Sequence, residues 1–376
     1  MSTENPRPSP EHFLTLIRQQ QRGRLKVYLG FAAGVGKTYE MLQEGQRLKR
    51  QGVDVVIGII ETHGRQETAA LIGDLEQVPR RKVEYRGVVL QEMDVDAILL
   101  RKPMVALVDE LAHTNAPDSR NAKRYQDVED LLRAGINVIT TLNIQHLESL
   151  YDVIEQATGI KVKERIPDYV LGMADQLVNV DLTAEDLRER LLAGKIYPSE
   201  RVQQALTNFF TPENLTRLRE LASSEIAHLL DRRRREQSNG ENRSGLERVM
   251  VCLSSRSPNT AALLRKGSRL AARLNAPWYA VYIQTPKEQM ERVDAGTQRQ
   301  VGNMLTLAHQ LGGVPMEFKG SEVVGTIATF VKEYSITHIV MGRSQRPWFR
   351  RWFSQPVLDR LLRTVEGVDV LVVGSM

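Results

Sequence analysis

Short apolar runs alternate with amphipathic segments along the first half of the chain. The apolar runs predict strands at 25–30, 53–60, 104–109, 136–142 and 176–181. The amphipathic segments between them predict helices at 37–50, 65–73, 122–134 and 145–157. Strands that alternate with helices are typical of a parallel sheet covered by helices. We therefore expect an α/β domain over residues 24–182.

The pattern changes after this domain. Residues 183–235 contain no strand-like run and predict a helical extension, with helices that begin at Thr183, Ser199 and Thr211. Residues 236–246 are charged and rich in Ser, Asn and Gly, which is typical of a linker. Ahead of the first domain, residues 1–23 predict a flexible lead-in with one short helix.

A second alternation occupies residues 247–376. Its apolar runs predict strands at 247–253, 278–283, 314–318, 337–342 and 368–373. Its amphipathic segments predict helices at 258–274, 286–311, 322–334 and 355–364. The same spacing argument therefore predicts a second α/β domain, built on a five-stranded sheet.

Composition narrows the class of protein. The 376 residues are 41% hydrophobic and 26% charged, values that are ordinary for globular proteins of about two domains. The net charge of +5 is mild, so no nucleic-acid partner is expected. Cys252 is the single cysteine, which excludes an internal disulfide and a cysteine-cluster metal site. No apolar run approaches the ~18 residues that span a bilayer, and we expect a soluble, cytoplasmic protein.

The segment after the first strand predicts a phosphate-binding P-loop. Gly34-Val35-Gly36-Lys37-Thr38 follows an apolar run and leads into a helix. Glycines let backbone N–H groups turn toward an anion, which the helix N-terminus also attracts. Lys37 would reach the β- and γ-phosphates of a nucleotide, and Thr38 would hold Mg²⁺. Phe31 replaces the first glycine of the motif, and Gly30 is the candidate for the same turn; an ordinary strand–turn–helix is the alternative.

Two carboxylates end a later apolar run. Asp109 and Glu110 follow Val105-Ala106-Leu107-Val108, in the order in which P-loop proteins place an acidic strand end. Asp109 would complete the Mg²⁺ site, and Glu110 could orient or deprotonate an attacking water. Acidic strand ends are also common without function. These residues do not separate a nucleotide-binding protein from a hydrolase.

Further polar residues are expected at the same sheet edge, because ligands bind at the carboxyl ends of parallel strands. Thr141, Asn143 and Gln145 follow the fourth predicted strand and could sense a γ-phosphate; helix capping by Asn143 is the alternative. Arg65 or Arg120 could supply an arginine to the phosphates, and nothing in the spacing selects one.

The second domain carries two weaker signals. Ser255 and Ser257 offer hydroxyl groups to a phosphate, with helix capping by Ser257 as the alternative. Trp278 and Tyr282 share one face of a predicted strand, where they either stack on a base or pack in the core. The loop Arg343–Phe353 interleaves arginines with aromatic residues and predicts a contact surface for a protein or a membrane surface.

Four motifs together resemble the N-terminal cytoplasmic region of the KdpD family, the osmosensitive potassium sensor histidine kinases. They are Gly36-Lys37-Thr38, Glu61–Arg65, Asp109–Asn115 and Thr141–Glu148. The resemblance implies a P-loop domain that binds ATP and Mg²⁺, followed by a universal-stress-protein domain. It also implies histidine-kinase or response-regulator partners, control of high-affinity potassium uptake, and membrane association through a partner.

The chain departs from the family pattern in ways that bear on activity. None of its seven histidines lies in the phospho-accepting motif, so autophosphorylation is not expected and weak ATPase activity is the enzymatic alternative. Gln345 and Gln355 replace glycines of the universal-stress-protein ATP signature, which weighs against ATP binding there. Some members of the sensor family bind cyclic di-AMP through a Ser-x-Ser turn and an aromatic strand. The corresponding residues here are Ser255, Ser257, Trp278 and Tyr282. A freestanding P-loop NTPase, a cyclic di-AMP receptor and a docking module remain the alternatives, and the oligomeric state is not indicated.

Overall fold

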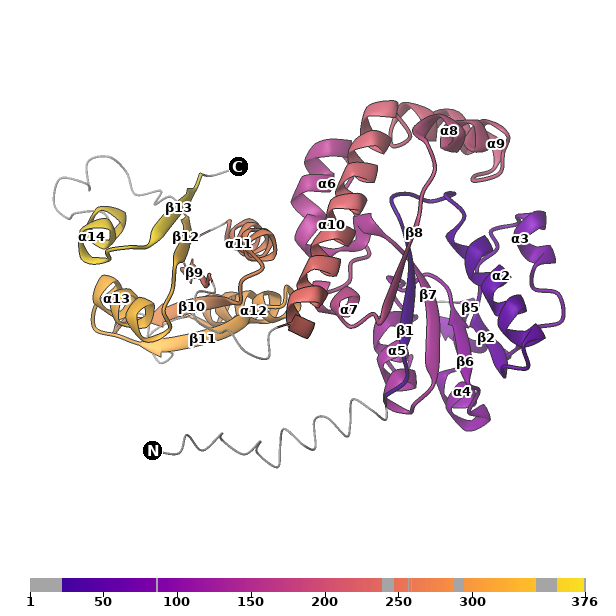
Figure 1. Cartoon of the computed structure of the whole chain (residues 1–376), viewed down its shortest axis with the longest axis horizontal. Coiled ribbons are helices and arrows are strands. Elements are labelled where there is room, and N and C mark those ends of the chain that lie inside the picture. Colours follow the sequence, from indigo (N-terminus) through magenta and orange to yellow (C-terminus); the bar gives the residue numbers. More distant parts are fainter. Residues whose placement is uncertain are drawn as a thin grey trace. The chain divides into compact units, whose positions relative to one another are not determined.

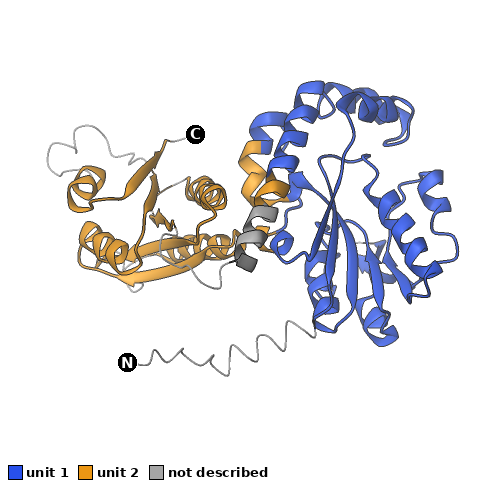
Figure 2. Ribbon diagram, in the orientation of Figure 1, with its two compact units in different colours: residues 1–146, 154–166, 170–224 blue, residues 147–153, 167–169, 225–376 orange. Residues whose placement is uncertain are grey.

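The computed structural model describes residues 22–85, 87–238, 247–255, 257, 259–286, 294–342 and 357–374. The chain divides into two compact units, coloured separately in Figure 2. Unit 1 comprises residues 1–146, 154–166 and 170–224, and unit 2 comprises residues 147–153, 167–169 and 225–376. The short helix predicted near the N-terminus and the loop Arg343–Phe353 lie outside the described residues.

A six-stranded sheet forms the centre of unit 1 (Figure 1). Its strands are β1 (Leu25–Gly30), β2 (Val55–Ile59), β3 (Glu76–Gln77), β6 (Val105–Val108), β7 (Asn137–Asn143) and β8 (Gln176–Val180). They lie in the order β3-β2-β6-β7-β1-β8, and every pairing is parallel. The predicted parallel α/β fold is therefore confirmed for this unit.

Helices cover this sheet, which explains why its strands β2 and β6 are apolar throughout. Every residue of β2 and β6 is buried, as expected for parallel strands covered on both faces. The helices of this region are α2 (Lys37–Arg50), α3 (Gln66–Ala70), α4 (Val95–Arg101), α5 (Arg124–Arg133), α6 (Tyr151–Thr158) and α7 (Asp168–Gly172). Among the described segments, no helix combines the length and the apolar character needed to cross a membrane.

The local elements of unit 1 differ from the predicted ones in several places, which include the unpredicted strand β3 and helix α7. The helix predicted at 145–157 is broken into two 3₁₀ turns, η1 (Ile144–His146) and η2 (Glu148–Leu150), before α6 begins. An antiparallel ribbon of β4 (Arg81–Tyr85) and β5 (Val88–Glu92) was not predicted. Helix α4 was also missed, although Asp94 caps it by accepting a hydrogen bond from the N–H of Ala97 at 2.9 Å.

The helical extension contains three helices that begin where the capping residues predict. They are α8 (Ala184–Leu192), α9 (Ser199–Thr207) and α10 (Pro212–Ser238). The Thr183 hydroxyl accepts a hydrogen bond from the N–H of Asp186 at 3.0 Å, and that of Thr211 accepts one from Asn214 at 3.2 Å. These threonines therefore act as N-caps.

A five-stranded parallel sheet forms the centre of unit 2. Its order is β11-β10-β9-β12-β13, which confirms the predicted second sheet. The strands are β9 (Val249–Leu253), β10 (Trp278–Gln284), β11 (Val314–Lys319), β12 (His338–Gly342) and β13 (Asp369–Val373). The helices are α11 (Thr260–Leu274), α12 (Ala295–Gln310), α13 (Val323–Glu333) and α14 (Val357–Thr364).

Strand β10 contributes to both apolar clusters of unit 2. Trp278, Ala280 and Tyr282 belong to one cluster, and Val281 and Ile283 belong to the other. This distribution confirms the predicted alternation of side chains along the strand. Trp278 and Tyr282 are only 5% and 3% exposed, so both aromatic side chains pack in the core.

Candidate functional site

The loop between β1 and α2 has the backbone conformation of a phosphate-binding turn. Gly34 and Gly36 have φ values of +89° and +109°, a region that side chains disfavour. Gly36 caps α2, and no side chain hydrogen-bonds to the cap. The first N–H groups of the helix are therefore available to an anion.

Gly30 has a different role from the one the sequence suggested. It is the last residue of β1, and a Cβ atom there would lie 2.6 Å from Cγ2 of Val35 and 3.0 Å from Cδ of Lys37. Gly30 thus provides clearance for the Lys37 side chain. Phe31, which replaces the first glycine of the motif, is 1% exposed and belongs to the core.

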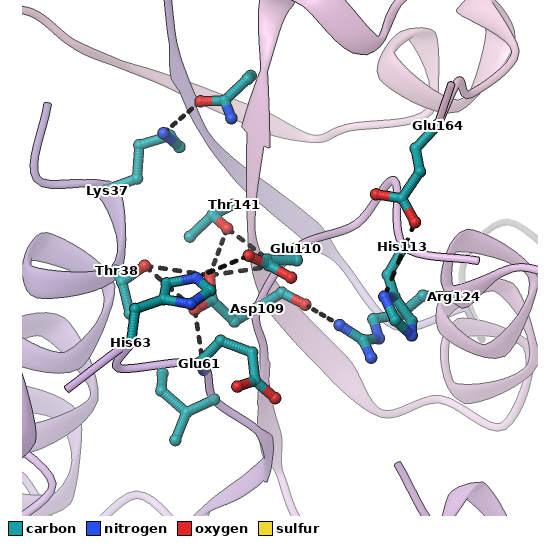
Figure 3. Close-up of polar contacts among 12 residues, drawn as sticks. Lys37, Thr38, Glu61, His63, Asp109, Glu110, His113, Arg124, Thr141 and Glu164 are labelled. Carbon is teal, nitrogen blue, oxygen red and sulfur yellow. Dashed lines mark hydrogen bonds and ion pairs between the residues drawn. The ribbon is translucent and has the colours of Figure 1, made fainter. Parts of the chain in front are cut away.

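Strand β7 lies between β6 and β1, and this order brings the polar side chains together (Figure 3). The Thr38 hydroxyl donates to the carboxylate of Asp109 at 3.1 Å, and the Thr141 hydroxyl donates to the same carboxylate. Lys37 Nζ donates to the Ala32 carbonyl at 3.0 Å and to Oδ1 of Asn143. Asn143 therefore contacts the P-loop lysine from the end of β7, directly ahead of the 3₁₀ turn that begins at Ile144.

Two buried charges face each other across this cluster without forming an ion pair. Burial lowers the pKa of Lys37, which is 8% exposed, to about 8. Burial raises the pKa of Asp109, which is 1% exposed, and the hydrogen bond from Thr141 opposes that rise. Among the described residues, no cationic side chain lies within ion-pair distance of Asp109. The site therefore holds a carboxylate and a lysine that a ligand of complementary charge would stabilise.

The oxygen atoms of Thr38 and Asp109 suit a hard cation such as Mg²⁺. Within the described part of the chain, no group of three or more His, Cys, Asp or Glu side chains could hold a metal ion by themselves. A cation at Thr38 and Asp109 would thus take further oxygen ligands from a bound phosphate or from water.

Glu110 and His63 form a second pair at the same edge. His63 Nε2 lies 3.0 Å from Oε1 of Glu110, and both residues have positive φ values, +51° and +54°. The hydrogen bond between them lowers the pKa of Glu110 and raises that of His63. Non-glycine residues in this conformation concentrate at functional sites, where the surrounding structure holds them.

Arg124 and Glu92 hold the backbone at the end of β6, and neither was predicted from the sequence. Arg124, 1% exposed, donates to the backbone carbonyl of Asp109 at 3.1 Å and pairs with Glu92 at 3.4 Å. His113 Nε2 contacts the same glutamate at 3.1 Å. No local pattern marks Arg124, because its role depends on contacts with residues distant in sequence.

Most of the site residues described so far line one cleft, whereas Arg124 and Glu92 do not. The lining residues include Gly34, Lys37, Thr38, His63, Arg65, Asp109, Glu110, His113, Thr141, Asn143, His146 and Glu164. Gln145 is not among them, and its Oε1 atom is buried without a hydrogen-bond partner among the described residues. Arg120 lies outside the cleft, where it pairs with Asp96 at 2.5 Å and Asp130 at 3.1 Å.

The connection between α8 and α9 covers the P-loop. Ile196 is 4% exposed, and its Cδ1 atom would lie 2.3 Å from a Cβ atom at Gly34. Arg190 donates to the Gly34 carbonyl at 3.3 Å, and Lys195 pairs with Glu67 at 3.0 Å. The helical extension therefore forms part of the surroundings of the candidate site, which the sequence did not predict.

The candidate residues of unit 2 are mostly buried. Helix α11 begins at Thr260 with Asn259 as its N-cap, so the alternative that Ser257 caps the helix is wrong. The N–H of Ser257 instead donates to the Ser254 carbonyl at 3.2 Å. Ser255 is 5% exposed. A ligand role for Ser255, Ser257, Trp278 and Tyr282 stays a prediction.

Residues 21–230 match the family described as “KdpD: Osmosensitive K+ channel His kinase sensor domain”, and residues 245–374 match the universal stress protein family. A putative sensor protein KdpD from Synechocystis sp. is 43% identical over 374 residues, which cover 100% of this chain and 98% of that protein. Sensor protein KdpD from Escherichia coli is 41% identical over 379 residues, 100% of this chain but 42% of that protein. A crystal structure of a universal stress protein in complex with cAMP aligns with 35% of this chain and 100% of its own, at 17% identity and a TM-score of 0.29. The chain thus spans nearly all of one relative and less than half of another.

Proposed function

Because the chain belongs to the KdpD family of sensor proteins, we propose that it is the ATP-binding sensory part of a KdpD-type two-component system. Such a system would control high-affinity potassium uptake in response to potassium or osmotic status. One observation supports ATP binding most directly: Lys37, Thr38 and Asp109 converge at the carboxyl edge of one parallel sheet. The family description supports the potassium and osmotic part of the proposal.

Each residue of the cluster has a role that its surroundings favour. Lys37 would contact the β- and γ-phosphates, and Gly34 and Gly36 would let the loop N–H groups face them. Thr38 and Asp109 would hold Mg²⁺, which neutralises phosphate charge when bound. Thr141 holds the Asp109 carboxylate in place through its hydroxyl. The side-chain oxygen of Gln145 is buried without a hydrogen-bond donor among the described residues. Gln145 would therefore respond to a rearrangement of the chain at the end of β7.

Calorimetric titration with Mg·ATP tests this assignment. Lys37→Ala removes a charge that would make about two charge-assisted hydrogen bonds, each worth about 1.5–3 kcal/mol. The expected result is an affinity at least roughly 100-fold weaker than that of the unchanged protein. Lys49→Ala is the matched control, because Lys49 pairs with Asp74 and does not line the cleft. Equal affinities in the Lys37→Ala variant and the control would refute the nucleotide site.

Hydrolysis of the nucleotide is the alternative that the Glu110 carboxylate favours. Its low pKa keeps it ionised beside the cleft, where it could activate water. Glu110→Gln should then retain nucleotide but lose phosphate release. If release is absent from the unchanged protein as well, the site binds nucleotide without turnover.

We also propose roles for the remaining parts of the chain. Residues 24–182 would form the nucleotide-binding domain, with 183–235 as its helical extension, 236–246 as a linker and 247–376 as the universal-stress-protein-like domain. The partners would be histidine-kinase or response-regulator components, with membrane association arising through such a partner.

Titration with cyclic di-AMP, with Ser255→Ala as the variant, tests whether the second domain binds this ligand. Loss of partner capture on changing Trp348 and Trp352 would support the docking role of Arg343–Phe353.

A further inference from the structure

One arginine of the candidate cleft has no acidic partner. Arg65 lines the cleft together with Lys37, Asp109 and Glu110. Its Nε atom is buried and has no hydrogen-bond partner among the described residues. Burial lowers the pKa of the Arg65 guanidinium, and the longer-range attraction of Asp109, Tyr197 and Glu110 opposes that effect without forming an ion pair. A half-buried cation is therefore held at the cleft without the anion that would satisfy it.

Three other arginines of unit 1 each have an acidic partner, although the Nε atom of Arg124 is also buried without a hydrogen-bond partner among the described residues. Arg80 pairs with Glu61 at 2.8 Å, and Arg124 pairs with Glu92 and the Asp109 carbonyl. Arg120, which the sequence left equal to Arg65 as a candidate, pairs with two aspartates outside the cleft. The structure thus distinguishes two arginines that the sequence could not.

The loop that carries Arg65 is held in a defined conformation. His63 and Gly64 both have positive φ values, +51° and +75°, and the N–H of Arg65 donates to the Thr62 carbonyl at 2.9 Å. The pair between His63 and Glu110 ties this loop to the end of β6. The Arg65 side chain is therefore positioned by the turn and not by a salt bridge of its own.

The strand order indicates which phosphate Arg65 would meet. Strand β2, which precedes this loop, lies beyond β6 as seen from β7 and β1. The P-loop follows β1. Asp109 follows β6, which lies between β1 and β2 in the sheet, and its carboxylate accepts a hydrogen bond from Thr38. A phosphate chain that starts at the P-loop and passes the Thr38–Asp109 pair would therefore present its terminal group to Arg65.

We propose that Arg65 contacts the terminal phosphate of a bound nucleoside triphosphate and makes the site discriminate triphosphate from diphosphate. This inference rests on the proposed function. The planar guanidinium donates two parallel hydrogen bonds to phosphate oxygens, a geometry that lysine cannot reproduce. A diphosphate lacks the group that Arg65 contacts, so its affinity does not depend on this side chain.

The test compares Mg·ADP with the Mg²⁺ complex of a non-hydrolysable ATP analogue in calorimetric titrations. Arg65→Gln should weaken binding of the analogue by roughly tenfold or more and leave ADP affinity within about twofold. Arg65→Lys keeps the charge, should retain the fold, and should lose part of the preference. Arg120→Gln is the matched control and should change neither affinity.

The outcomes separate this inference from the proposed function. If the unchanged protein binds neither nucleotide, the proposed function and the role of Arg65 both fail. If Lys37→Ala abolishes binding of both nucleotides while Arg65→Gln preserves the preference for the triphosphate, only the role of Arg65 fails. A parallel loss of both affinities in Arg65→Gln and Arg65→Lys would likewise overturn it, because that result indicates a structural role.

Discussion

Gly34→Ala probes the contact between the P-loop and the connection that covers it. The substitution places a Cβ atom on a backbone with φ of +89° and 2.3 Å from Cδ1 of Ile196. Gly52→Ala is the matched control, because Gly52 has a similar φ of +82° but nothing within 4 Å of the added atom. The two variants therefore share the backbone cost and differ in the steric one.

The two costs can be estimated separately. A left-handed conformation costs a non-glycine residue about 1–2 kcal/mol, and alanine recovers about 0.4–1 kcal/mol by restricting the unfolded chain. Gly52→Ala should thus cost about 1 kcal/mol. Gly34→Ala must also displace Ile196, a side chain whose full removal would cost about 2–5 kcal/mol. We expect a total of about 2–4 kcal/mol for Gly34→Ala.

Urea unfolding of the variants measures these differences, and a double-mutant cycle with Ile196→Ala isolates the contact. The double variant should be more stable than the sum of the single effects by at least about 1 kcal/mol, because the small side chain no longer meets the new methyl group. Mg·ATP affinity, measured in parallel, reports whether the covering connection also shapes the site. Equal costs for Gly34→Ala and Gly52→Ala, together with additivity in the cycle, would show that Ile196 does not lie against the P-loop.

Two further predictions concern charged groups. Burial lowers the pKa of Lys37 to about 8, and a bound phosphate would favour its charged form, so binding should take up a proton above pH 8. Mg·ATP affinity should then fall by up to about tenfold per pH unit above pH 8, and a flat profile in calorimetric titrations would contradict this. Arg265, 8% exposed, donates to Glu148 at 2.7 Å and to Asp152 at 2.8 Å within unit 2. Arg265→Gln should cost about 3–5 kcal/mol of unfolding free energy, against at most about 1 kcal/mol for Arg219→Gln, whose pair with Asp181 is exposed; equal losses in urea unfolding would refute the difference.

Local patterns were sufficient to predict the two parallel sheets apart from β3, a two-residue exposed strand that no apolar run marks. An apolar run of strand length followed by an amphipathic helix is a property of neighbouring residues, so it can be recognised without the fold. The glycines of the P-loop were recognisable for the same reason. Gly34 and Gly36 require positive φ values that the residue type itself permits, and Lys37 and Thr38 follow at fixed positions. The prediction of one continuous helix over residues 145–157 was wrong, because this segment forms two 3₁₀ turns before α6 begins.

Only the tertiary structure decided which of the candidate residues share a site. The position of β7 between β6 and β1 brings Thr141 to Asp109 and Asn143 to Lys37. The burial of Arg124 behind Asp109 also depends on the fold, as does the selection of Arg65 over Arg120. The physical reason is that strand order and helix packing are set by contacts between segments far apart in the chain. A side chain's partners, burial and charge environment follow from those contacts, and no pattern of neighbouring residues encodes them.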